Sequence, residues 1–553
     1  MKLVTTAQMR ALEQAAVDAG ATWEGLMEQA GRGAAQEALR LLGAPEGRHV
    51  LVLVGPGNNG GDGLVAARYL HDAGAQVVLY IWRRRESPDD ANWRRCRERA
   101  IAEYAASADP AYATLRRLLA ESDLVIDALL GMGVSRPVEG ELAAIVVLVN
   151  STKAPGIGHR APGLGSAVPG ARFLVLAIDL PTGVHSDSGE VLGTALQADL
   201  TVATGLVKRG LLLYPGRGYA GAIRVADIGI DPEHMEGIMS ETIEAGWVRA
   251  LLPERPDDAH KGTFGKVMVV AGSLFYPGAA SLATAGAARV GAGLVTLATG
   301  RSAFGGPGRL PEVTLRPLPE AELGVLGEEA ADELLKHLDG YQALLVGPGL
   351  GREAPTRAFL DRLLGLDSPR HRGHIGFRIG TSEEKPVEKQ RPELPHTVID
   401  ADGLNLLSEI ERWWERLPRG RCVLTPHPGE MRRLLKVEEL ERDVARVAEG
   451  AAETWGQVVV LKGATTVVAD PDGRSALNDG GNAALATAGT GDVLAGAIAG
   501  LLAQGLKPFE AAVLGVYLHS AAGRMVREEL GDAGTLASDL LPRLPLAIKR
   551  LKS

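Results

Sequence analysis

Short, uninterrupted apolar runs recur along almost the whole chain of 553 residues, and Ala- and Leu-rich helical patterns separate them. Examples in the first half are HVLVLVG at 49–55, AQVVLYIW at 75–82, DLVIDALLG at 123–131 and RFLVLAIDLP at 172–181. Runs without polar alternation are typical of strands buried on both faces of a parallel sheet, with crossover helices between them. The first half is therefore predicted to form a doubly wound α/β domain.

The alternation stops after VADIGID at 225–231, because the stretch from 232 to 262 is polar, contains prolines and holds no predicted buried strand. Apolar runs then resume in GKVMVVAGS at 265–273, GLVTLATG at 293–300, ALLVGPGLG at 343–351, TVIDADGLN at 397–405, CVLTPHPGE at 422–430 and VVVLKGATTVVAD at 458–470. A chain of this length exceeds one ordinary hydrophobic core. We expect a Rossmann-like domain over 1–230, a linker over 231–245 and a second α/β domain over 246–553.

Composition excludes several classes of protein. The chain is 46% apolar and 23% charged, which fits a soluble globular protein. A net charge of −9 disfavours nucleic-acid binding, and two cysteines cannot build a disulfide framework or a cysteine-rich zinc site. The first residues predict an amphipathic helix in which Gln8, Arg10 and Glu13 interrupt any signal-peptide core, and no apolar run is long enough for a membrane span. We expect a cytoplasmic protein without nucleic-acid or membrane partners.

Two segments, 154–172 and 368–395, are rich in Gly and Pro or in charge and are predicted to be exposed loops. His371 and His374 in the second segment have the spacing of helical metal ligands. Pro369 and Gly373 argue against a helix there, so we expect a loop without a metal.

The stretch VGPGNNGGDG at 54–63 lies where a predicted strand gives way to a predicted helix. Free N–H groups and the helix dipole attract anions at such a junction, and glycine lets a ligand approach the main chain. Asn58, Asn59 and Asp62 add amides and a carboxylate, which favours a ligand site over a simple turn. The structural alternative is a tight turn in which Asp62 is the helix N-cap.

Two further aspartates follow buried runs, Asp127 in VIDALLGMGVSRP at 125–137 and Asp179 in LAIDLPTGVHSD at 176–187. In doubly wound folds the carboxyl ends of strands face a common crevice, so these groups can converge on one ligand. Oxygen ligands of this kind suit a hard cation better than zinc.

In the second half, ATAGTGDVLAGAIAGLLAQG at 486–505 predicts a buried helix that begins with glycines. Such a start presents N–H groups to a phosphate, and Asp492 beside it can accept a proton from an attacking hydroxyl. The alternative is an aspartate that only stabilises a helix start. VLKGATTVV places Lys462 and Thr466 near a strand end, and LTPHPGE presents His427 between two prolines.

GPGNNGGDG, DALLGMGVSRPVEG and IDLPTGVHSDSG resemble the signature stretches of the NAD(P)H-hydrate epimerase domain, over about residues 1–230. That domain interconverts the R and S forms of NAD(P)H hydrated at carbon 6 of the nicotinamide ring. The resemblance implies that the hydrate is bound by Asn58, Asn59, Gly60, Gly61, Asp62, Gly131, Met132, Gly133, Val134, Ser135, Arg136, Pro137 and Asp179. It implies a potassium ion (K+) held by Asn59, Asp127 and Thr182, where the family usually has serine in place of Thr182. We expect Asp179 to be the catalytic acid or base, with Asp62 as the alternative.

The motifs of the second half resemble the ribokinase-like ADP/ATP-dependent NAD(P)H-hydrate dehydratase domain, over about residues 245–553. The resemblance implies that the hydrate is contacted by Ala283, Gly349, His427 and Asp492. It implies that the nucleotide is held by Lys462, Gly463, Ala464, Thr465, Thr466 and Gly491. Phosphoryl transfer to the carbon-6 hydroxyl would then allow elimination to NAD(P)H, with Asp492 as the catalytic base and Mg2+ neutralising phosphate charge.

The order of the two domains matches the bifunctional NAD(P)H-hydrate repair enzymes of bacteria and archaea, which combine an isomerase and a lyase. The resemblance implies NADHX and NADPHX, the hydrates of NADH and NADPH, as substrates. ADP, leaving AMP, is the implied co-substrate, with ATP as the other possibility, and we expect a homo-oligomer. One alternative is a ribokinase-like kinase for a vitamin or sugar, fused to a non-catalytic binding domain. Another is a binding scaffold that reuses an epimerase-like fold without catalysis.

Overall fold

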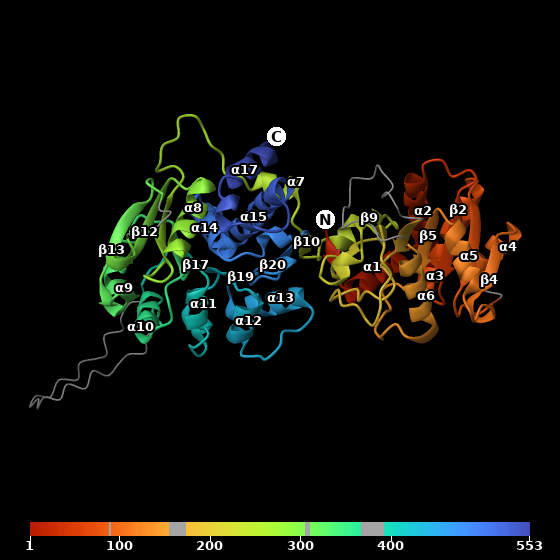
Figure 1. Ribbon diagram of the computed structural model, residues 1–553, viewed down its shortest axis with the longest axis horizontal. Coiled ribbons are helices and arrows are strands. Elements are labelled where there is room, and N and C mark those ends of the chain that lie inside the picture. The colour runs from red at the N-terminus through yellow and green to blue at the C-terminus, as the bar shows by residue number, and fades with distance from the viewer. Residues whose placement is uncertain (88–89, 154–172, 305–309, 367–391) are drawn as a thin grey trace, which may run out of the picture. The chain divides into compact units, whose positions relative to one another are not determined.

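The computed structural model describes residues 1–87, 90–153, 173–304, 310–366 and 392–553. These residues form two compact units, an N-terminal domain (Met1–Glu241) and a C-terminal domain (Thr242–Ser553) (Figure 1). The division falls within the segment 231–245, which also contributes the three-residue strand β10 (Ser240–Thr242) that the sequence did not indicate. The predicted loop at 154–172 lies outside the described residues, as do residues 368–391 of the second predicted loop, including His371 and His374.

The N-terminal domain contains a seven-stranded sheet in the order β4-β3-β2-β5-β6-β7-β9, with every neighbouring pair parallel. Its strands are β2 (His49–Val54), β3 (Gln76–Ile81), β4 (Ala102–Ala105), β5 (Leu124–Ala128), β6 (Leu174–Ile178), β7 (Leu200–Thr204) and β9 (Ala222–Ala226). The predicted runs at 49–55, 75–82, 123–131 and 172–181 each contain one of these strands. The order reverses between β2 and β5, and the carboxyl ends of these two strands border the crevice where ligands bind in such folds.

Helices cover both faces of this sheet. They are α2 (Trp23–Leu42), α3 (Asn58–Asp72), α4 (Ala91–Glu98), α5 (Ala113–Glu121) and α6 (Gly140–Thr152), whereas α1 (Thr6–Asp18) packs in a separate apolar cluster. Successive side chains of a strand point to opposite faces. In β2, Val50 and Val52 accordingly pack in a cluster with α2, α3 and α4, whereas Leu51 and Leu53 pack in a cluster with α5 and α6. A short parallel pair, β1 (Leu3–Val4) with β8 (Val207–Lys208), lies outside the sheet.

The C-terminal domain contains a ten-stranded sheet in the order β10-β21-β20-β19-β18-β17-β16-β11-β12-β13. Its other strands are β11 (Lys266–Val270), β12 (Leu294–Gly300), β13 (Thr314–Leu318), β16 (Ala343–Val346), β17 (His396–Ile399), β18 (Cys422–Leu424), β19 (Val458–Leu461), β20 (Thr466–Ala469) and β21 (Ser475–Asn478). Pairing is parallel from β13 to β19 and antiparallel from β19 to β21. The strand order reverses between β11 and β16, which gives this sheet a switch point as well. A separate hairpin joins β14 (Glu320–Glu322) to β15 (Val325–Leu326).

The helices of this domain also form two layers (Figure 1). One layer contains α7 (Ala245–Ala250), α8 (Pro277–Arg289), α14 (Thr490–Ala503), α15 (Pro508–Leu530), α16 (Ala537–Leu540) and α17 (Leu544–Lys552), which share one apolar cluster with the sheet. The other contains α9 (Glu328–Leu335), α10 (Ala354–Leu363), α11 (Asp402–Leu407), α12 (Pro428–Leu435) and α13 (Val444–Trp455). Both domains are thus α/β, which confirms the predicted fold class.

Glycine makes the packing of α8 against α14 possible. A Cβ atom at Gly496 of α14 would collide with the carbonyl oxygen of Ala283, and one at Gly286 of α8 would lie 2.5 Å from the carbonyl oxygen of Val493. The small residues of these two helices therefore let their backbones approach closely. Among the described residues, no helix is long and apolar enough to cross a membrane.

Candidate active sites in the two domains

The glycine-rich stretch at 54–63 lies against the end of β5, at the switch point of the first sheet. A Cβ atom at Gly55 would collide with the carbonyl oxygen of Leu129, so only glycine allows this contact. Helix α3 begins at Asn58 with Gly57 as its N-cap. The interpretation of Asp62 as a helix N-cap is therefore wrong, because Asp62 lies in the second turn.

Asp127 and Thr182 form a hydrogen-bonded pair at the carboxyl ends of β5 and β6. Thr182 donates to Asp127 through both its hydroxyl and its N–H, each at 2.7 Å, and both residues are fully buried. Asn59 is 8% exposed, and neither atom of its amide has a hydrogen-bond partner within the described part of the chain. Burial raises the pKa of Asp127 to about 6, because its hydrogen bonds only partly offset the loss of water.

Asp179 follows β6 and is 5% exposed, with a backbone φ of +67° that is unusual for a non-glycine residue. Its Oδ1 atom accepts from the Thr204 hydroxyl at 2.9 Å and pairs with Lys208 Nζ at 2.6 Å. Its Oδ2 atom accepts from the Met132 N–H at 3.2 Å. A Cβ atom at Gly131 would lie 3.2 Å from Asp179 Oδ2 and 3.3 Å from Asn59 Oδ1, so all three predicted residues border one small space.

Two charged residues that the sequence did not single out belong to this cluster. Lys208 is fully buried, and its Nζ atom also donates to the carbonyl oxygen of Thr204 at 2.6 Å. Glu13 of α1 is close enough to interact electrostatically with Lys208 and Asp179, and burial raises its pKa. Burial, followed by the charges of Asp179 and Glu13, raises the pKa of Asp62 well above its usual value. The cluster therefore combines a paired lysine and aspartate with a carboxyl group that retains its proton at higher pH.

The remaining residues predicted to bind the hydrate differ in accessibility. Gly60 and Gly61 are buried in α3, Asn58 is exposed, and Val134 is 6% exposed. The loop residues Gly133, Ser135, Arg136 and Pro137 are exposed. Gly131 and Met132 lie beside Asp179, so contact of the whole loop 131–137 with a ligand stays a prediction.

In the C-terminal domain, Asp492 lies in the first turn of α14 as expected, close to Lys462. A Cβ atom at Gly491 would lie 3.3 Å from Lys462 Nζ. Burial raises the pKa of Asp492 to about 7, and the charge of Asp400 adds to the shift. Within the described residues, the Asp492 carboxylate has neither a hydrogen-bond nor an ion-pair partner.

Asp400, which follows β17, is the direct partner of Lys462. Its Oδ1 atom accepts from Lys462 Nζ and from the Thr425 hydroxyl, each at 2.7 Å, and Asp400 is 1% exposed. Burial alone would lower the pKa of Lys462, but the charges of Asp400 and Glu430 outweigh it and raise the pKa.

His427 and Glu430 form a reciprocal cap at the start of α12. The Gly429 N–H donates to His427 Nδ1 at 3.0 Å, and the His427 N–H donates to Glu430 Oε2 at 2.9 Å. The His427 ring is about half exposed (51%), whereas Glu430 is 5% exposed. Burial raises the pKa of Glu430 to about 7, although the charge of Lys462 opposes the shift.

The other predicted residues of this domain lie in different surroundings. Lys462 and the residues up to Thr465 form the turn between β19 and β20, and Thr466 begins β20. Gly349 has a φ of +64°, and a Cβ atom there would lie 2.7 Å from Tyr276 Cβ, so it is packed against the start of α8. Ala283 is fully buried between α8 and α14. Its predicted contact with the hydrate stays a prediction.

Comparisons with known proteins match both halves of the chain. The family model described as NAD(P)H-hydrate dehydratase matches residues 267–546, and the one described as YjeF-related protein N-terminus matches residues 24–210. The bifunctional NAD(P)H-hydrate repair enzyme Nnr of Moorella thermoacetica is 36% identical over 571 residues, which cover 100% of this chain and 97% of the relative. The chain belongs to the bifunctional NAD(P)H-hydrate repair enzyme family.

Other members of this family are similar to the chain over nearly its whole length. The repair enzymes of Thermofilum pendens and Coxiella burnetii are 36% and 35% identical, and they cover 100% and 98% of this chain. The matches extend over 97% and 98% of the relatives' own lengths. Among solved structures, the chain is similar to the ADP/ATP-dependent NAD(P)H-hydrate dehydratase of Bacillus subtilis, with 31% identity, coverage of 56% of this chain and 98% of that one, and a TM-score of 0.43.

Two charged residues of the sites, Asp400 and Lys208, were not predicted from the sequence, and only one of them follows a recognisable sequence pattern. Asp400 directly follows a buried apolar run, as Asp127 and Asp179 do, so the same signal could have found it. Lys208 follows an ordinary two-residue apolar pair, and its partner Asp179 is distant in sequence. No local pattern distinguishes such a lysine from an exposed one.

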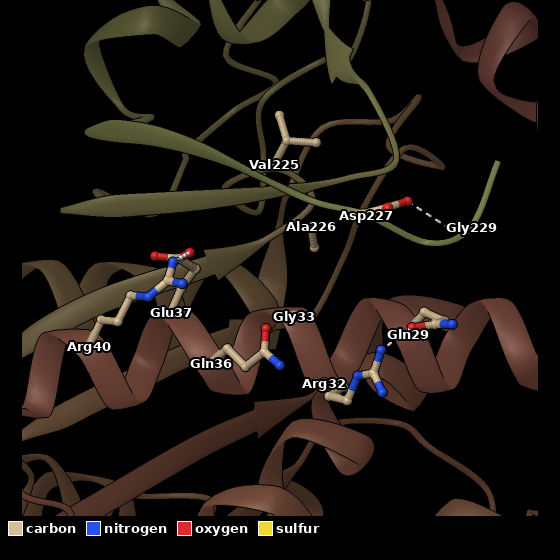
Figure 2. A pocket seen from close by; sticks show the side chains of 10 residues that line it. All are labelled: Gln29, Arg32, Gly33, Gln36, Glu37, Arg40, Val225, Ala226, Asp227 and Gly229. Atoms are coloured by element: carbon tan, nitrogen blue, oxygen red, sulfur yellow. Dashed lines mark hydrogen bonds and ion pairs between the residues drawn. The ribbon is translucent and has the colours of Figure 1, made fainter. Parts of the chain in front are cut away.

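A cavity of about 430 Å3 in the N-terminal domain lies apart from these residues. Its walls are α2 and the end of β9 with the loop that follows, as Figure 2 shows. The lining residues are Gln29, Arg32, Gly33, Gln36, Glu37, Arg40, Val225, Ala226, Asp227 and Gly229. None of the residues predicted for the epimerase site lines it, so this cavity does not identify the active site. Among the described residues, no group of three or more His, Cys, Asp or Glu side chains could hold a metal ion.

Proposed function

We propose that the N-terminal domain interconverts the R and S forms of NADHX and NADPHX, and that the C-terminal domain converts the S form to NAD(P)H at the expense of ADP or ATP. Family membership over the whole chain supports the two activities. The observation that carries the residue assignments is the gathering of acidic side chains at the carboxyl ends of both sheets, with Asp179 and Asp62 in one domain and Asp492 in the other.

For the epimerase, inversion at carbon 6 requires that the bond to the hydroxyl oxygen break and re-form on the opposite face of the ring. An acid must protonate the departing hydroxyl, and a base must accept the proton of the water that adds. Asp62, whose pKa is raised, suits the acid, and Asp179, paired with Lys208, suits the base. Asp62 loses one proton and Asp179 gains one from the added water, so a proton must return from Asp179 to Asp62 through water before the next turnover, and the reaction consumes no net proton.

The residues predicted to hold K+ fit that ion chemically. Asp127 is a fully buried carboxylate with no ion-pair partner among the described residues, and the buried Asn59 amide lacks a hydrogen-bond partner. A monovalent cation would neutralise the first and coordinate the oxygen of the second. Asn59, Asp127 and Thr182 would hold the ion, which supplies a fixed positive charge beside the hydrate.

For the dehydratase, Asp492 would accept the proton of the carbon-6 hydroxyl as that oxygen attacks the terminal phosphorus of ADP or ATP. The products of that step are a phosphate ester and AMP or ADP. Loss of inorganic phosphate from carbon 6 and of a proton from carbon 5 then restores the double bond of NAD(P)H. Lys462 and the N–H groups at the start of α14 would bind the phosphates.

The acidic residues around Lys462 also fit Mg2+. Glu430 and Asp492 offer carboxylate oxygens, the kind of ligand that Mg2+ prefers, and burial raises the pKa of each. They would hold the ion together with the nucleotide phosphates, and Mg2+ supplies neutralisation of the phosphate charge. Asp400, already paired with Lys462, would orient that lysine.

The test is to supply the purified full chain with an R/S mixture of chemically hydrated NADH, with or without ADP or ATP. With a nucleotide we expect complete recovery of the absorbance of NADH, because epimerisation feeds the R form into the dehydratase. Starting from a sample enriched in one epimer, without a nucleotide, we expect the two epimers to equilibrate without any recovery. A chain that leaves the hydrate unchanged but phosphorylates a vitamin alcohol would contradict the proposal and support the kinase alternative.

Two broader expectations also belong to this proposal, namely a cytoplasmic location and a homo-oligomeric state. They rest on the composition of the sequence and on the family resemblance. Fractionation of the source cells and light scattering of the purified chain test them. A monomer in solution or a chain recovered with membranes would contradict them.

A further inference from the structure

The carbonyl oxygen of Thr490, in the first turn of α14, accepts a hydrogen bond from a buried histidine of α15. His519 Nε2 lies 2.9 Å from this oxygen, and His519 is 8% exposed. Because a carbonyl oxygen can only accept, Nε2 must carry the proton in this contact. Burial lowers the pKa of His519 to about 4, so the ring is neutral near pH 7.

This contact bears on the neighbouring N–H group, because Thr490 and Gly491 share one peptide plane. In a trans peptide the C=O and N–H bonds point in opposite directions. A carbonyl held toward His519 therefore directs the Gly491 N–H away from α15. Gly491 itself borders Lys462, since a Cβ atom there would lie 3.3 Å from Lys462 Nζ.

The first turn of α14 needs such an anchor. Gly489, the N-cap, has a φ of +90°, and Gly491 follows Thr490, so glycines flank the peptide on both sides. Glycine loses more conformational entropy on ordering than other residues, and the first N–H groups of a helix, including that of Gly491, have no intrahelical acceptor. The Thr490 hydroxyl donates to the carbonyl oxygens of Leu485 and Thr487, which fixes its side chain, while His519 holds the peptide itself.

We propose that His519 is a positioning residue of the dehydratase, which holds the Thr490–Gly491 peptide so that the Gly491 N–H faces the phosphate of the nucleotide. This inference rests on the proposed function, in which ADP or ATP binds at the start of α14. His519 does not touch the nucleotide and acts only through the peptide. Removing a donor that stabilises developing charge costs roughly 10²–10³ in rate, so a donor that is merely loosened should cost about 10-fold to 10²-fold.

The test compares His519→Leu with His519→Gln in the full chain. Leucine removes the hydrogen bond and keeps an apolar volume, whereas glutamine can place an amide N–H near the position of Nε2. We expect the leucine variant to lower the dehydratase kcat about tenfold or more while the KM for the hydrate stays unchanged. We expect the glutamine variant to recover most of the lost rate.

A second measurement separates positioning from packing, namely the binding of ADP relative to adenosine, which lacks the phosphates. His519→Leu should weaken ADP binding and leave adenosine binding unchanged. The control Leu518→Ala removes a fully buried side chain of the same helix and should lower stability without changing the ratio of the two affinities.

Three outcomes would overturn the inference. They are a leucine variant with wild-type kcat and ADP binding, a glutamine variant as impaired as the leucine one while adenosine still binds, and an equal loss of ADP and adenosine binding. A wild-type chain that recovers no NADH from the hydrate with ADP or ATP would instead overturn the proposed function, so the two failures are distinguishable.

Discussion

Both domains place a lysine beside a buried aspartate at the carboxyl edge of a sheet, but the two lysines have different partners. In the N-terminal domain Lys208 pairs at 2.6 Å with Asp179, the predicted catalytic residue itself. In the C-terminal domain Lys462 pairs at 2.7 Å with Asp400, and the predicted catalytic residue, Asp492, has no direct partner among the described residues. One lysine thus pairs with the predicted catalytic carboxylate, whereas the other pairs with an aspartate beside the predicted catalytic residue.

The two domains also differ in which carboxyl groups have raised pKa values. In the C-terminal domain, burial raises the pKa of Asp492 to about 7, and a pKa near neutral pH suits a general base. In the N-terminal domain burial raises the pKa of Asp62, which interacts electrostatically with Asp179 and Lys208, and it also raises the pKa values of Asp127 and Glu13. The same substitution, aspartate to asparagine, should therefore have different consequences for stability in the two domains.

The largest effect is expected for Asp492→Asn, which should lower the dehydratase kcat by about 10³-fold, because asparagine cannot accept the proton of the hydroxyl. The melting temperature should stay the same or rise, since a buried carboxyl without a direct partner becomes a neutral amide. Recovery of NADH absorbance and scanning calorimetry measure the two effects. Asp472→Asn, at an exposed residue of the same domain, is the matched control. A variant that keeps the wild-type rate would exclude Asp492 as the base.

Asp179→Asn should lower both epimerase activity and stability, because it leaves Lys208 buried without a counter-charge. Breaking a buried pair from one side typically costs about 3–5 kcal/mol of the free energy of unfolding. Epimerase rates should fall by about 10²-fold or more, measured as the slow consumption of the R form. Lys208→Met should act similarly, and the double variant should recover stability but not activity.

The control for this pair is Lys153→Met, which breaks a more exposed ion pair of the same domain, 2.7 Å from Asp199. We expect a much smaller loss of stability there, because water can solvate the remaining carboxylate. Equal losses of stability in Lys208→Met and Lys153→Met would show that burial does not make the Lys208–Asp179 pair more important than an exposed pair. The proposed difference between the two domains would then be contradicted.

The sequence predicted the sheets well because their strands are continuous apolar runs, a signal that depends on the residues of each strand alone. It also found Asp127, Asp179 and Asp492, which directly follow such runs or begin an apolar helix. Strand β9 was missed because it is a half-exposed edge strand, AIRVA, without a continuous apolar run.

The charged partners of the site were harder to predict. Lys208 and Glu13 reach Asp179 only after β6, β8 and α1 have come together, and nothing local marks either residue as buried. Only the alternative role of Asp62 as a helix N-cap was wrong, since α3 begins at Asn58 and includes glycines of the stretch 54–63. Ion pairs that depend on tertiary packing thus could not be predicted from the sequence, whereas aspartates at the ends of strands could.

A smaller effect is expected from the removal of K+, and it tests the N-terminal site alone. Replacing K+ by choline at constant ionic strength should slow epimer equilibration about tenfold, because Asp127 and the Asn59 amide lose the cation that would balance them. The Asn59→Ala variant should require a higher K+ concentration than the wild type to reach half of its maximal rate of epimer equilibration. Equilibration of the epimers without a nucleotide is the measurement. A rate independent of K+ in both proteins would contradict the site.

The smallest effect concerns the pH dependence of stability in the C-terminal domain, where Glu430 and Asp492 both have pKa values of about 7. These values lie above those of the unfolded chain, so the folded domain binds more protons, and stability is full at low pH and is lost as pH rises toward about 7. Without ligands, the melting temperature of this domain should fall by a few degrees between pH 5 and pH 8. Glu430→Gln and Asp492→Asn should each flatten this dependence, whereas Glu329→Gln, at an exposed residue of α9, should not. A steeper dependence in either variant than in the wild type would mean that these carboxyl groups are balanced in the folded state, as Asp179 is by Lys208.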